Sequence, residues 1–456
     1  MNIHAIANNG FSVGRNAEGM VVFVEGAVPG DEVEVEFFAK KKGSWFGKIN
    51  QLIQASIHRK EPHCAHFGVC GGCSWQHIDY AEQLHQKELW AKDAIQRIAK
   101  IPNALFEPII PARETTYYRN KLEYTFSTHR WKLFNETETA EDQNKALGFH
   151  RPGHFQKIVD IHHCFHQGGV SNDIRNFIRA YTMEQGWDYY DIKNHTGLLR
   201  NLTLRSNSLE EYMCIICFGR DDQEKIHQLS NAVSKTFPQI KSIYTAVNTK
   251  YNDSIYDLDL QLFYGIPFLT ETWEHVKFLI GPKSFFQTNP KQAQVLFQLI
   301  ESYCELKGGE TILDLYCGVG SIGIYLARNA AKVIGVETIQ AAVEDARKNA
   351  LANNLENCEF HMGMAESLEL SSWILERARP DIVIVDPPRM GLHDKVCQEL
   401  LKMQIEKLIY VSCNPSTQAR DIDRLSEKYK VIKLSPVDMF PHTNHVECVA
   451  LLSLRT

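Results

Sequence analysis

The stretch Asp314-Leu-Tyr-Cys-Gly-Val-Gly-Ser-Ile-Gly323 decides the fold class, because it leads from an apolar strand-like run through a glycine-rich turn into a helical pattern. Glycines at the end of a strand permit a tight turn and a close approach between a ligand and the backbone. The next apolar run ends at Glu337, 19 residues beyond Gly318, where a carboxylate can accept hydrogen bonds from ribose hydroxyls. Turn and carboxylate together indicate a cofactor that contains adenosine. The turn lacks a full G-x-G-x-x-G sequence, which favours S-adenosylmethionine (SAM) over a nicotinamide dinucleotide.

Strand-like and helical patterns alternate around this stretch, from about residue 281 to residue 456. The strand-like runs are Thr311–Tyr316, Lys332–Val336, Asp381–Val385, Lys407–Ser412 and Cys448–Leu454. Helical patterns between the first four runs predict a parallel sheet with helices on both faces, which is an α/β fold. Ligands of such folds bind at the carboxyl ends of the strands, so the residues that follow each run are the candidate functional residues.

Two further domains precede this one. Residues 1–55 contain short strand-like runs separated by glycine and proline turns, which predicts a small β-barrel. The run Lys40-Lys41-Lys42 followed by Trp45 and Phe46 places positive charge beside aromatic rings, as nucleic-acid-binding barrels do, although a solvated hairpin tip with a core tryptophan fits the same pattern. Residues 56–280 form a central region of mixed α+β pattern that opens with a cysteine cluster and a helical stretch at Tyr80–Ala99. We therefore expect domains at 1–55, 56–280 and 281–456.

The composition excludes several protein classes. Of the 456 residues, 44% are apolar and 23% are charged, so the chain is not disordered, collagen-like or a coiled coil. A formal charge of −6 is not that of a basic nucleic-acid binder, so any RNA contact must use local patches. No apolar run reaches the ~20 residues that span a bilayer, and no export signal is present. We therefore expect a soluble, cytoplasmic protein with reduced cysteines and no membrane partner, for which a monomer is sufficient.

The run Asp381–Val385 is followed by Asp386-Pro387-Pro388-Arg389. Two prolines after an acidic residue make a stiff loop that aims the carboxylate into the cleft. Amino-group methyltransferases carry a similar sequence followed by an aromatic residue, and Arg389 in that place argues against their chemistry. The alternative is a rigid turn in which Asp386 caps a helix.

The last two runs border Cys413 and Glu447. Cys413 lies in Ser412-Cys413-Asn414-Pro415, just before a helix whose N-terminal amides favour anions, so we expect a lowered thiol pKa and a candidate nucleophile. Glu447 has apolar neighbours in His445-Val446-Glu447-Cys448-Val449, and partial burial raises a carboxyl pKa and suits it to proton abstraction. The alternatives are a packing cysteine and a glutamate in solvent at a strand edge.

Five motifs in this order resemble the RNA uracil-C5 methyltransferase family over nearly the whole chain. They are Phe285-Phe286-Gln287-Thr288-Asn289, DLYCGVG, VDPPR, SCNP followed by Thr417, and HVECV. The resemblance implies a class I, Rossmann-like SAM-dependent methyltransferase domain at the C-terminus and an N-terminal TRAM domain, which is an RNA-binding β-barrel.

The same resemblance assigns the site residues. By it, the SAM contacts are Gln287, Tyr316, Ser321, Glu337 and Asp386. It places Phe285 and Asp386 at the target base, Cys413 as the nucleophile that adds to uracil C6, and Glu447 as the general base that removes the C5 proton. The product is 5-methyluridine.

Four cysteines form a candidate metal site, namely Cys64, Cys70, Cys73 and Cys164. Their spacing fits zinc and an iron–sulfur cluster about equally, neighbouring histidines (His63, His66, His162 and His163) favour zinc, and unliganded thiols are the third possibility. The family resemblance of C-x5-C-G-G-C-x2-Q favours a 4Fe-4S cluster with a structural role. The segment Tyr118–Lys121, also similar to the family, offers cations for phosphate contacts.

The cluster and the barrel resemble the branch that modifies 23S ribosomal RNA more than the transfer-RNA branch. Three other readings remain open at this point. They are a transfer-RNA methyltransferase, a non-catalytic RNA-binding or ribosome-assembly factor on the same scaffold, and an amino-group methyltransferase. An intact Cys413 and Glu447 argue against the last two, and a redox enzyme is the most distant reading.

Overall fold

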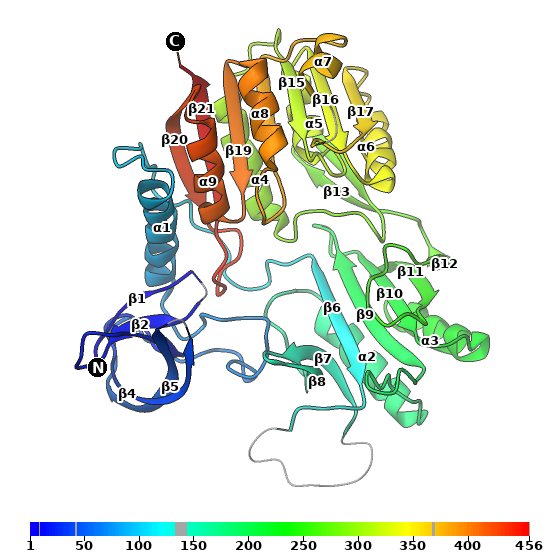
Figure 1. The fold of residues 1–456 in the computed structure, drawn as a ribbon. Coiled ribbons are helices and arrows are strands. Elements are labelled where there is room, and N and C mark those ends of the chain that lie inside the picture. Colours follow the sequence, from blue (N-terminus) through cyan, green and yellow to red (C-terminus); the bar gives the residue numbers. More distant parts are fainter. Residues whose placement is uncertain (9, 42, 133–143, 367–369, 456) are drawn as a thin grey trace.

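The computed structural model of the protein describes residues 1–8, 10–41, 43–132, 144–366 and 370–455. These residues form a barrel, a central sheet with helices and a C-terminal sheet with helices (Figure 1). None of the helices in these ranges combines the length and the apolar composition needed to cross a lipid bilayer.

The N-terminal strands form a sheet of order β1-β2-β3-β5-β4 that curls into a barrel (Figure 1). A bridge between Asn2 and Glu32 links the two edge strands, and Val22, Val24 and Val33 fill the interior. Lys42, one of the three lysines at the β4–β5 tip, lies outside the described residues. The strands are β1 (Ile3–Ile6), β2 (Ser12–Arg15), β3 (Val21–Glu25), β4 (Glu32–Lys41) and β5 (Ser44–Gln54).

The central sheet has the order β12-β11-β10-β9-β6-β7-β8 and carries helices α2 (Ser171–Glu184) and α3 (Gln223–Thr236). Apart from the parallel pair β10–β11, its neighbouring strands are antiparallel. The strands are β6 (Lys121–Ser127), β7 (Ala146–Arg151), β8 (His154–Asp160), β9 (Leu199–Ser206), β10 (Tyr212–Phe218), β11 (Ile240–Val247) and β12 (Gln261–Gly265).

The C-terminal sheet has the order β17-β16-β15-β18-β19-β21-β20. Its first five strands are parallel, and β21 is antiparallel both to β19 and to β20. The predicted α/β fold is therefore confirmed. The strands are β15 (Thr311–Leu315), β16 (Lys332–Glu337), β17 (Cys358–Met362), β18 (Ile382–Val385), β19 (Lys407–Ser412), β20 (Tyr429–Val437) and β21 (Glu447–Leu454). The helices are α4 (Pro290–Cys304), α5 (Ser321–Leu326), α6 (Gln340–Ala352), α7 (Leu370–Leu375), α8 (Asp394–Met403) and α9 (Pro415–Leu425).

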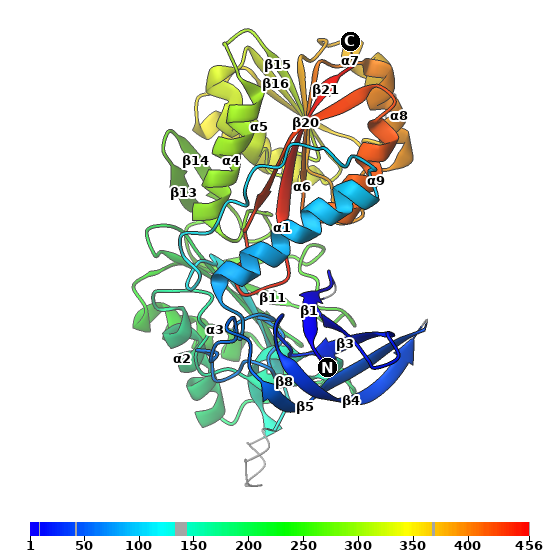
Figure 2. The ribbon, with the colours of Figure 1, turned by 90° about the vertical axis from the view of Figure 1, so that its left-hand side faces the viewer.

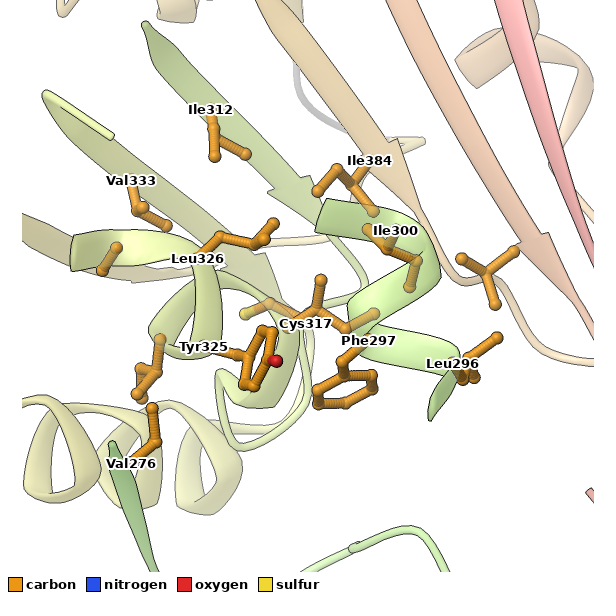
Figure 3. Close-up of a cluster of buried hydrophobic side chains, with 14 of the residues drawn as sticks. Val276, Leu296, Phe297, Ile300, Ile312, Cys317, Tyr325, Leu326, Val333 and Ile384 are labelled. Carbon is orange, nitrogen blue, oxygen red and sulfur yellow. The ribbon is translucent and has the colours of Figure 1, made fainter. Parts of the chain in front are cut away.

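Alternate side chains of these strands enter two separate cores. Ile312, Val333 and Ile384 pack with α4 and α5 on one face, where Phe297 and Tyr325 lie with their ring centroids 5.7 Å apart (Figure 3). The residues next to them in sequence, such as Leu313 and Val383, pack with α8 and α9 on the other face. This alternation is the pattern of a parallel sheet that is covered on both sides.

Two segments from residues 56–280 pack on the C-terminal sheet. Helix α1 (Tyr80–Arg97), capped by Asp79, runs beside β20 and α9 and places Ala91 and Ile95 in the same core as Leu425 (Figure 2). The hairpin β13 (Leu269–Trp273) and β14 (Val276–Ile280) packs Trp273 against Phe297 of α4. Both segments thus contribute apolar surface to the C-terminal cores.

Candidate active site

The candidate functional residues gather at one edge of the C-terminal sheet. Strands β15, β16, β18 and β19 are parallel and end at this edge, whereas β21 is antiparallel to β19 and begins there. Ser412 is paired with Cys448. Cys413, which follows Ser412, therefore stands opposite Glu447, which precedes Cys448.

Cys413 is half-buried between the end of β19 and the start of α9. Burial and the nearby carboxylates of Glu447 and Asp386 raise the pKa of its thiol to about 11, while Arg389 opposes this shift. The predicted lowering of this pKa is therefore wrong for the free protein. The sequence reveals the helix N-terminus, but the two acidic neighbours come from other strands. The side chain of Asn414, the N-cap of α9, also accepts a hydrogen bond from the backbone N–H of Ser416. This amide of the helix N-terminus is therefore already bonded.

Glu447 is the first residue of β21 and only 8% of its surface is exposed. Burial raises the pKa of its carboxyl to about 8, the charge of Asp386 adds to the shift, and Arg389 opposes it. The rise has the direction that its apolar neighbours predict. A carboxylate with this pKa is a stronger base than an exposed glutamate.

Asp386 follows β18 and is half-buried, and burial raises its pKa to about 7. Its backbone N–H donates to Leu315 at 3.4 Å, which ties the Asp-Pro-Pro loop to β15. The cap of the next helix, α8, is His393. Asp386 is therefore not the helix cap that the alternative interpretation required.

Residues 314–321 form the cofactor turn, in which Tyr316 (φ +64°), Gly318 (φ +56°) and Gly320 (φ +76°) have left-handed backbones. A Cβ atom on Gly320 would lie 2.8 Å from the Phe360 ring, so the turn packs directly on β17. Ser321 opens α5. A non-glycine residue in the left-handed region, as at Tyr316, is a feature that concentrates at functional sites.

The carboxylate of Glu337 faces the cofactor turn. One oxygen accepts from the backbone N–H of Gly318 (3.0 Å), and the other accepts from the N–H groups of Thr338 (2.7 Å) and Ile339 (3.0 Å). These bonds fix the orientation of the carboxylate at the end of β16, where the sequence predicts a ribose contact.

Asp314 is a buried acidic residue of this region that sequence reasoning did not single out. Burial raises its pKa to about 7, and one carboxyl oxygen accepts from the N–H of Gly323 at 3.0 Å. Its other oxygen is buried without a hydrogen-bond partner among the described residues. An acidic residue at the first position of the glycine motif was the available signal.

Phe285 precedes α4 and is 64% exposed, whereas its neighbours Ser284 and Phe286 are buried. Asn120 fixes this segment, because its side chain donates to the Gln287 carbonyl (3.1 Å) and its backbone N–H donates to Thr288 (2.8 Å). An aromatic ring that is exposed on a fixed backbone is available for stacking on a nucleobase.

Two hollows lie on either side of His445. One is bounded by β1, β2, α1 and Cys413, and the other by the cysteine-rich segment, β6 and Thr288. The cations that line them are Arg15, Arg97 and Arg389 in the first and Arg119 and Lys121 in the second. Both hollows contain His445 and carry cations, and Cys413 lines the first of them. Neighbouring hollows that carry cations suit a polyanionic chain.

The four predicted ligand cysteines line one cavity. Burial raises the pKa of Cys70 and Cys73 to about 12, and the neighbouring thiols add to both shifts. The Gly72 N–H donates to the Cys70 sulfur at 3.3 Å, and the Cys73 sulfur lies 3.0 Å from His166 Nε2. Across the described ranges, no three His, Cys, Asp or Glu side chains are arranged as ligands of a metal ion.

Comparisons with known proteins relate the whole chain to RNA methyltransferases. The tRNA (Uracil-5-)-methyltransferase family matches residues 274–455. The chain is 42% identical over all of its length to an uncharacterized RNA methyltransferase of Porphyromonas gingivalis, which it also covers completely. It is 33% identical to an uncharacterized RNA methyltransferase of Bacillus cereus, over 98% of this chain and 95% of that one.

A solved structure resembles the whole chain. It is the tRNA (uracil-54, C5)-methyltransferase of Pyrococcus abyssi in complex with S-adenosyl-L-homocysteine, with a TM-score of 0.77, 30% sequence identity and 99% coverage of both chains. The similarity extends over the full length of the chain, and the glycine turn of residues 314–321 lies at the same sheet edge as Cys413 and Glu447. The chain belongs to the family of SAM-dependent RNA (uracil-5-)-methyltransferases.

Proposed function

We propose that the enzyme forms 5-methyluridine in 23S ribosomal RNA through a covalent bond between Cys413 and uracil C6, with Glu447 as the base that removes the C5 proton. It acts as a monomer in the cytoplasm. The observation that carries the proposal is the pairing of Ser412 with Cys448, which sets Cys413 opposite Glu447 at the edge that also holds the cofactor turn.

The first step activates the base. Uracil C5 is too weak a nucleophile to attack a methyl group unaided. The Cys413 sulfur gives up its proton and adds to C6, and the electrons of the C5–C6 double bond move toward C5 and the C4 carbonyl. Asp386 and Glu447 are the carboxylates next to the thiol. Asp386 takes the thiol proton, so that Glu447 stays unprotonated for the second step. SAM, when bound, supplies the electrophilic methyl group that C5 takes.

The second step restores the aromatic ring. C5 now carries both a methyl group and a proton. Glu447 takes that proton, the C5–C6 double bond forms again, and the Cys413 sulfur leaves as the thiolate. The pKa of Glu447, about 8, lies close to neutral pH. A general base is most effective when its pKa is near the pH at which the enzyme works.

The cofactor and the base have separate binding groups. Glu337 holds the ribose hydroxyls, and Gln287, Tyr316, Ser321 and Asp386 complete the SAM site. The target uracil is flipped out of the RNA stack onto the exposed ring of Phe285, and Asp386 lies within the same site. Arg119, Lys121 and the cations beside Cys413 contact phosphates on either side.

The 4Fe-4S cluster is part of the proposal. Its ligands would be Cys64, Cys70, Cys73 and Cys164, which line one cavity. Four cysteines in one cavity would supply one thiolate to each iron of such a cluster. The cluster would cross-link the cysteine segment to the central sheet, because the uracil chemistry needs no electron. Iron and sulfide analysis of protein purified without oxygen tests this, and stoichiometric zinc would contradict it.

The choice of 23S RNA rests on the cysteines and on the TRAM-like barrel. In the barrel, Lys40 Nζ lies 4.8 Å above the Trp45 ring and Phe37 is 46% exposed, an arrangement suited to RNA. Transfer RNA is the second candidate substrate, because the matched family and the Pyrococcus abyssi enzyme are named for it.

A trapping experiment tests the chemistry and the substrate together. The enzyme and SAM are incubated with 23S fragments and with transfer RNA, each containing 5-fluorouracil. Fluorine cannot leave as the proton does, so the base stays bonded to Cys413. We expect a denaturant-stable, SAM-dependent complex with 23S RNA. A complex with transfer RNA alone would show that transfer RNA, and not 23S RNA, is the substrate. No complex with either RNA would favour a non-catalytic RNA-binding factor or an amino-group methyltransferase.

The variant Glu447→Gln tests the base. The methylated adduct should form on ordinary RNA and remain attached, because no carboxylate removes the C5 proton. Normal turnover by this variant would show that Glu447 is not the base.

A further inference from the structure

The segment that leads into Glu447 is held mainly from outside itself. Residues 438–446, here called the base loop, connect β20 to β21. Inside the loop, Phe440 N–H donates to Asp438 (3.2 Å), and the Thr443 N–H (3.3 Å) and Oγ1 (2.8 Å) both donate to the Phe440 carbonyl. The His445 N–H donates to Thr443 Oγ1 at 3.3 Å. Asn289, the N-cap of α4, donates to the Met439 carbonyl at 3.0 Å. The other partners described below come from α1 and from the cysteine segment.

Gln83 of α1 binds the middle of the base loop. Its side chain is fully buried, and its oxygen accepts from the His442 backbone N–H at 2.9 Å. Its amide nitrogen lies 3.1 Å from His442 Nδ1 and also donates to the carbonyls of Trp75 (3.0 Å) and Ile78 (2.8 Å). One side chain therefore ties the base loop both to α1 and to the segment that follows the cysteines.

Two other anchors act on the same stretch. The N–H groups of Ser74 (2.9 Å) and Trp75 (3.0 Å) donate to the His442 carbonyl, so His442 is held on both sides of its peptide. Four residues after Gln83, the Lys87 ammonium donates to Asp438 (2.6 Å) and to the Phe440 carbonyl (3.1 Å), and this ion pair is completely buried.

Among the described residues, neither Gln83 nor Lys87 forms a hydrogen bond to the opposite side of the active site, although α9 itself packs on α1. Cys413 is placed by β19 and by the Asn414 cap of α9, and the cofactor turn is placed by β15 and by Glu337. Loosening the base loop should therefore disturb the group that removes the C5 proton and leave the groups that add the methyl in position.

We propose that Gln83 is a positioning residue that acts through His442 to hold Glu447 against the C5 proton of the methylated intermediate. The inference rests on the proposed function, in which Glu447 is the base. If Gln83 acts in this way, its replacement slows removal of the C5 proton and does not slow methyl transfer. Displacement of a reacting group by a fraction of an ångström to 1 Å lowers a rate by about 10- to 100-fold.

The variant Gln83→Met tests the inference, and Gln86→Met is its matched control. Gln86 is also buried on α1, but it accepts from the Ile6 N–H (3.1 Å) and donates to Glu82 (2.7 Å), and neither residue belongs to the base loop. Both variants remove buried hydrogen bonds from the same helix, so a general loss of stability affects both.

The readout is the fate of the methyl group. Methyl-tritiated SAM labels two species, namely the protein-bound adduct after methyl transfer and the released RNA product. For Gln83→Met we expect the ratio of bound to released label to rise about tenfold, while the single-turnover rate of methyl transfer stays within about twofold of the wild type. The ratio for Gln86→Met should equal that of the wild type.

Three outcomes would overturn the inference. The ratio for Gln83→Met equals that of the wild type, both steps slow by the same factor, or Gln86→Met changes the ratio as much. Should Gln83→Met not fold, His442→Phe replaces it, because this change removes the Nδ1 contact and keeps the backbone bonds; a wild-type ratio there counts against the inference. Glu447→Gln is measured in parallel, and normal turnover in that variant refutes the base assignment itself, whatever Gln83 does.

Discussion

The cofactor turn and the base loop lie at the same edge of one sheet, but they are built in different ways. The turn is local, since the Gly318–Glu337 hydrogen bond joins residues 19 apart in sequence. The base loop depends on residues that are far away, since Lys87 and Asp438 are 351 apart and Gln83 and His442 are 359 apart. A local motif can therefore specify the conformation of the turn, whereas the position of Glu447, the proposed base, is a property of the assembled chain.

The largest effect is expected where the two regions meet. Cys413→Ala should lower turnover by about 10⁴-fold or more, the order of loss seen when a covalent nucleophile is removed. Calorimetry should show SAM affinity within about twofold of the wild type, because the turn and Glu337 are intact. An active Cys413→Ala enzyme would favour the amino-group methyltransferase, which has no use for this thiol.

The second-largest effect is a loss of stability that we expect in the base loop and not in the cofactor turn. Lys87→Met leaves the Asp438 carboxylate buried with Tyr80 as its remaining side-chain donor, which should cost about 3–5 kcal/mol. Hydrogen exchange should become faster across residues 438–446 and stay unchanged across residues 314–321. The double variant Lys87→Met/Asp438→Asn should recover part of the loss, and equal exchange in both regions would show that the pair does not act locally.

A third test addresses the turn alone with two neighbouring glycines. Gly320→Ala places a methyl group 2.8 Å from Phe360 and imposes a left-handed alanine, so SAM affinity should fall by about 10-fold or more. Gly318→Ala meets no atom within 4 Å and has only the backbone strain to overcome, so its loss should be smaller. Equal losses in the two variants would mean that contact with β17 does not shape the turn.

The smallest effect concerns the pH dependence of stability. The folded-state pKa of Glu447, about 8, lies above the 4.5 of an ordinary glutamate, so its contribution to stability is complete at low pH and declines as pH rises through 8. Between pH 7 and pH 9 the decline is about 1.4 kcal/mol for one such group. Denaturant titrations at the two pH values should show a smaller decline in Glu447→Gln, and an unchanged decline would contradict the raised pKa.

The sequence was most informative where structure is local. Alternation of apolar runs and helices predicted the parallel sheet, and the glycine turn with Glu337 predicted the cofactor edge, because each pattern lies within a few tens of residues. Strand β17 (Cys358–Met362) escaped prediction, since only part of it is buried and it shows no apolar run.

The remaining features depend on contacts that a pattern does not contain. The raised pKa of Cys413 comes first from burial and then from Glu447 at the start of β21 and Asp386 after β18, which are distant in sequence. The packing of α1 beside β20 likewise brings together residues more than 300 positions apart. Gln83 and Lys87 look like ordinary polar residues of an exposed helix until the fold buries them. The sequence shows only two polar side chains one turn apart on a helix, and it gives no sign of their burial or of their partners.

The strand order of the C-terminal sheet also bears on when the enzyme becomes competent during synthesis. β21 follows β20 in the chain, yet it lies between β19 and β20 in the sheet. A nascent chain that has emerged only as far as β20 has Cys413 in place, an unpaired edge on β19 and no Glu447 opposite the thiol. Insertion of β21 closes that edge and brings Glu447, the proposed base, to the thiol in the same event. If Glu447 is the base, completion of the sheet is also the moment at which the enzyme can first release its product.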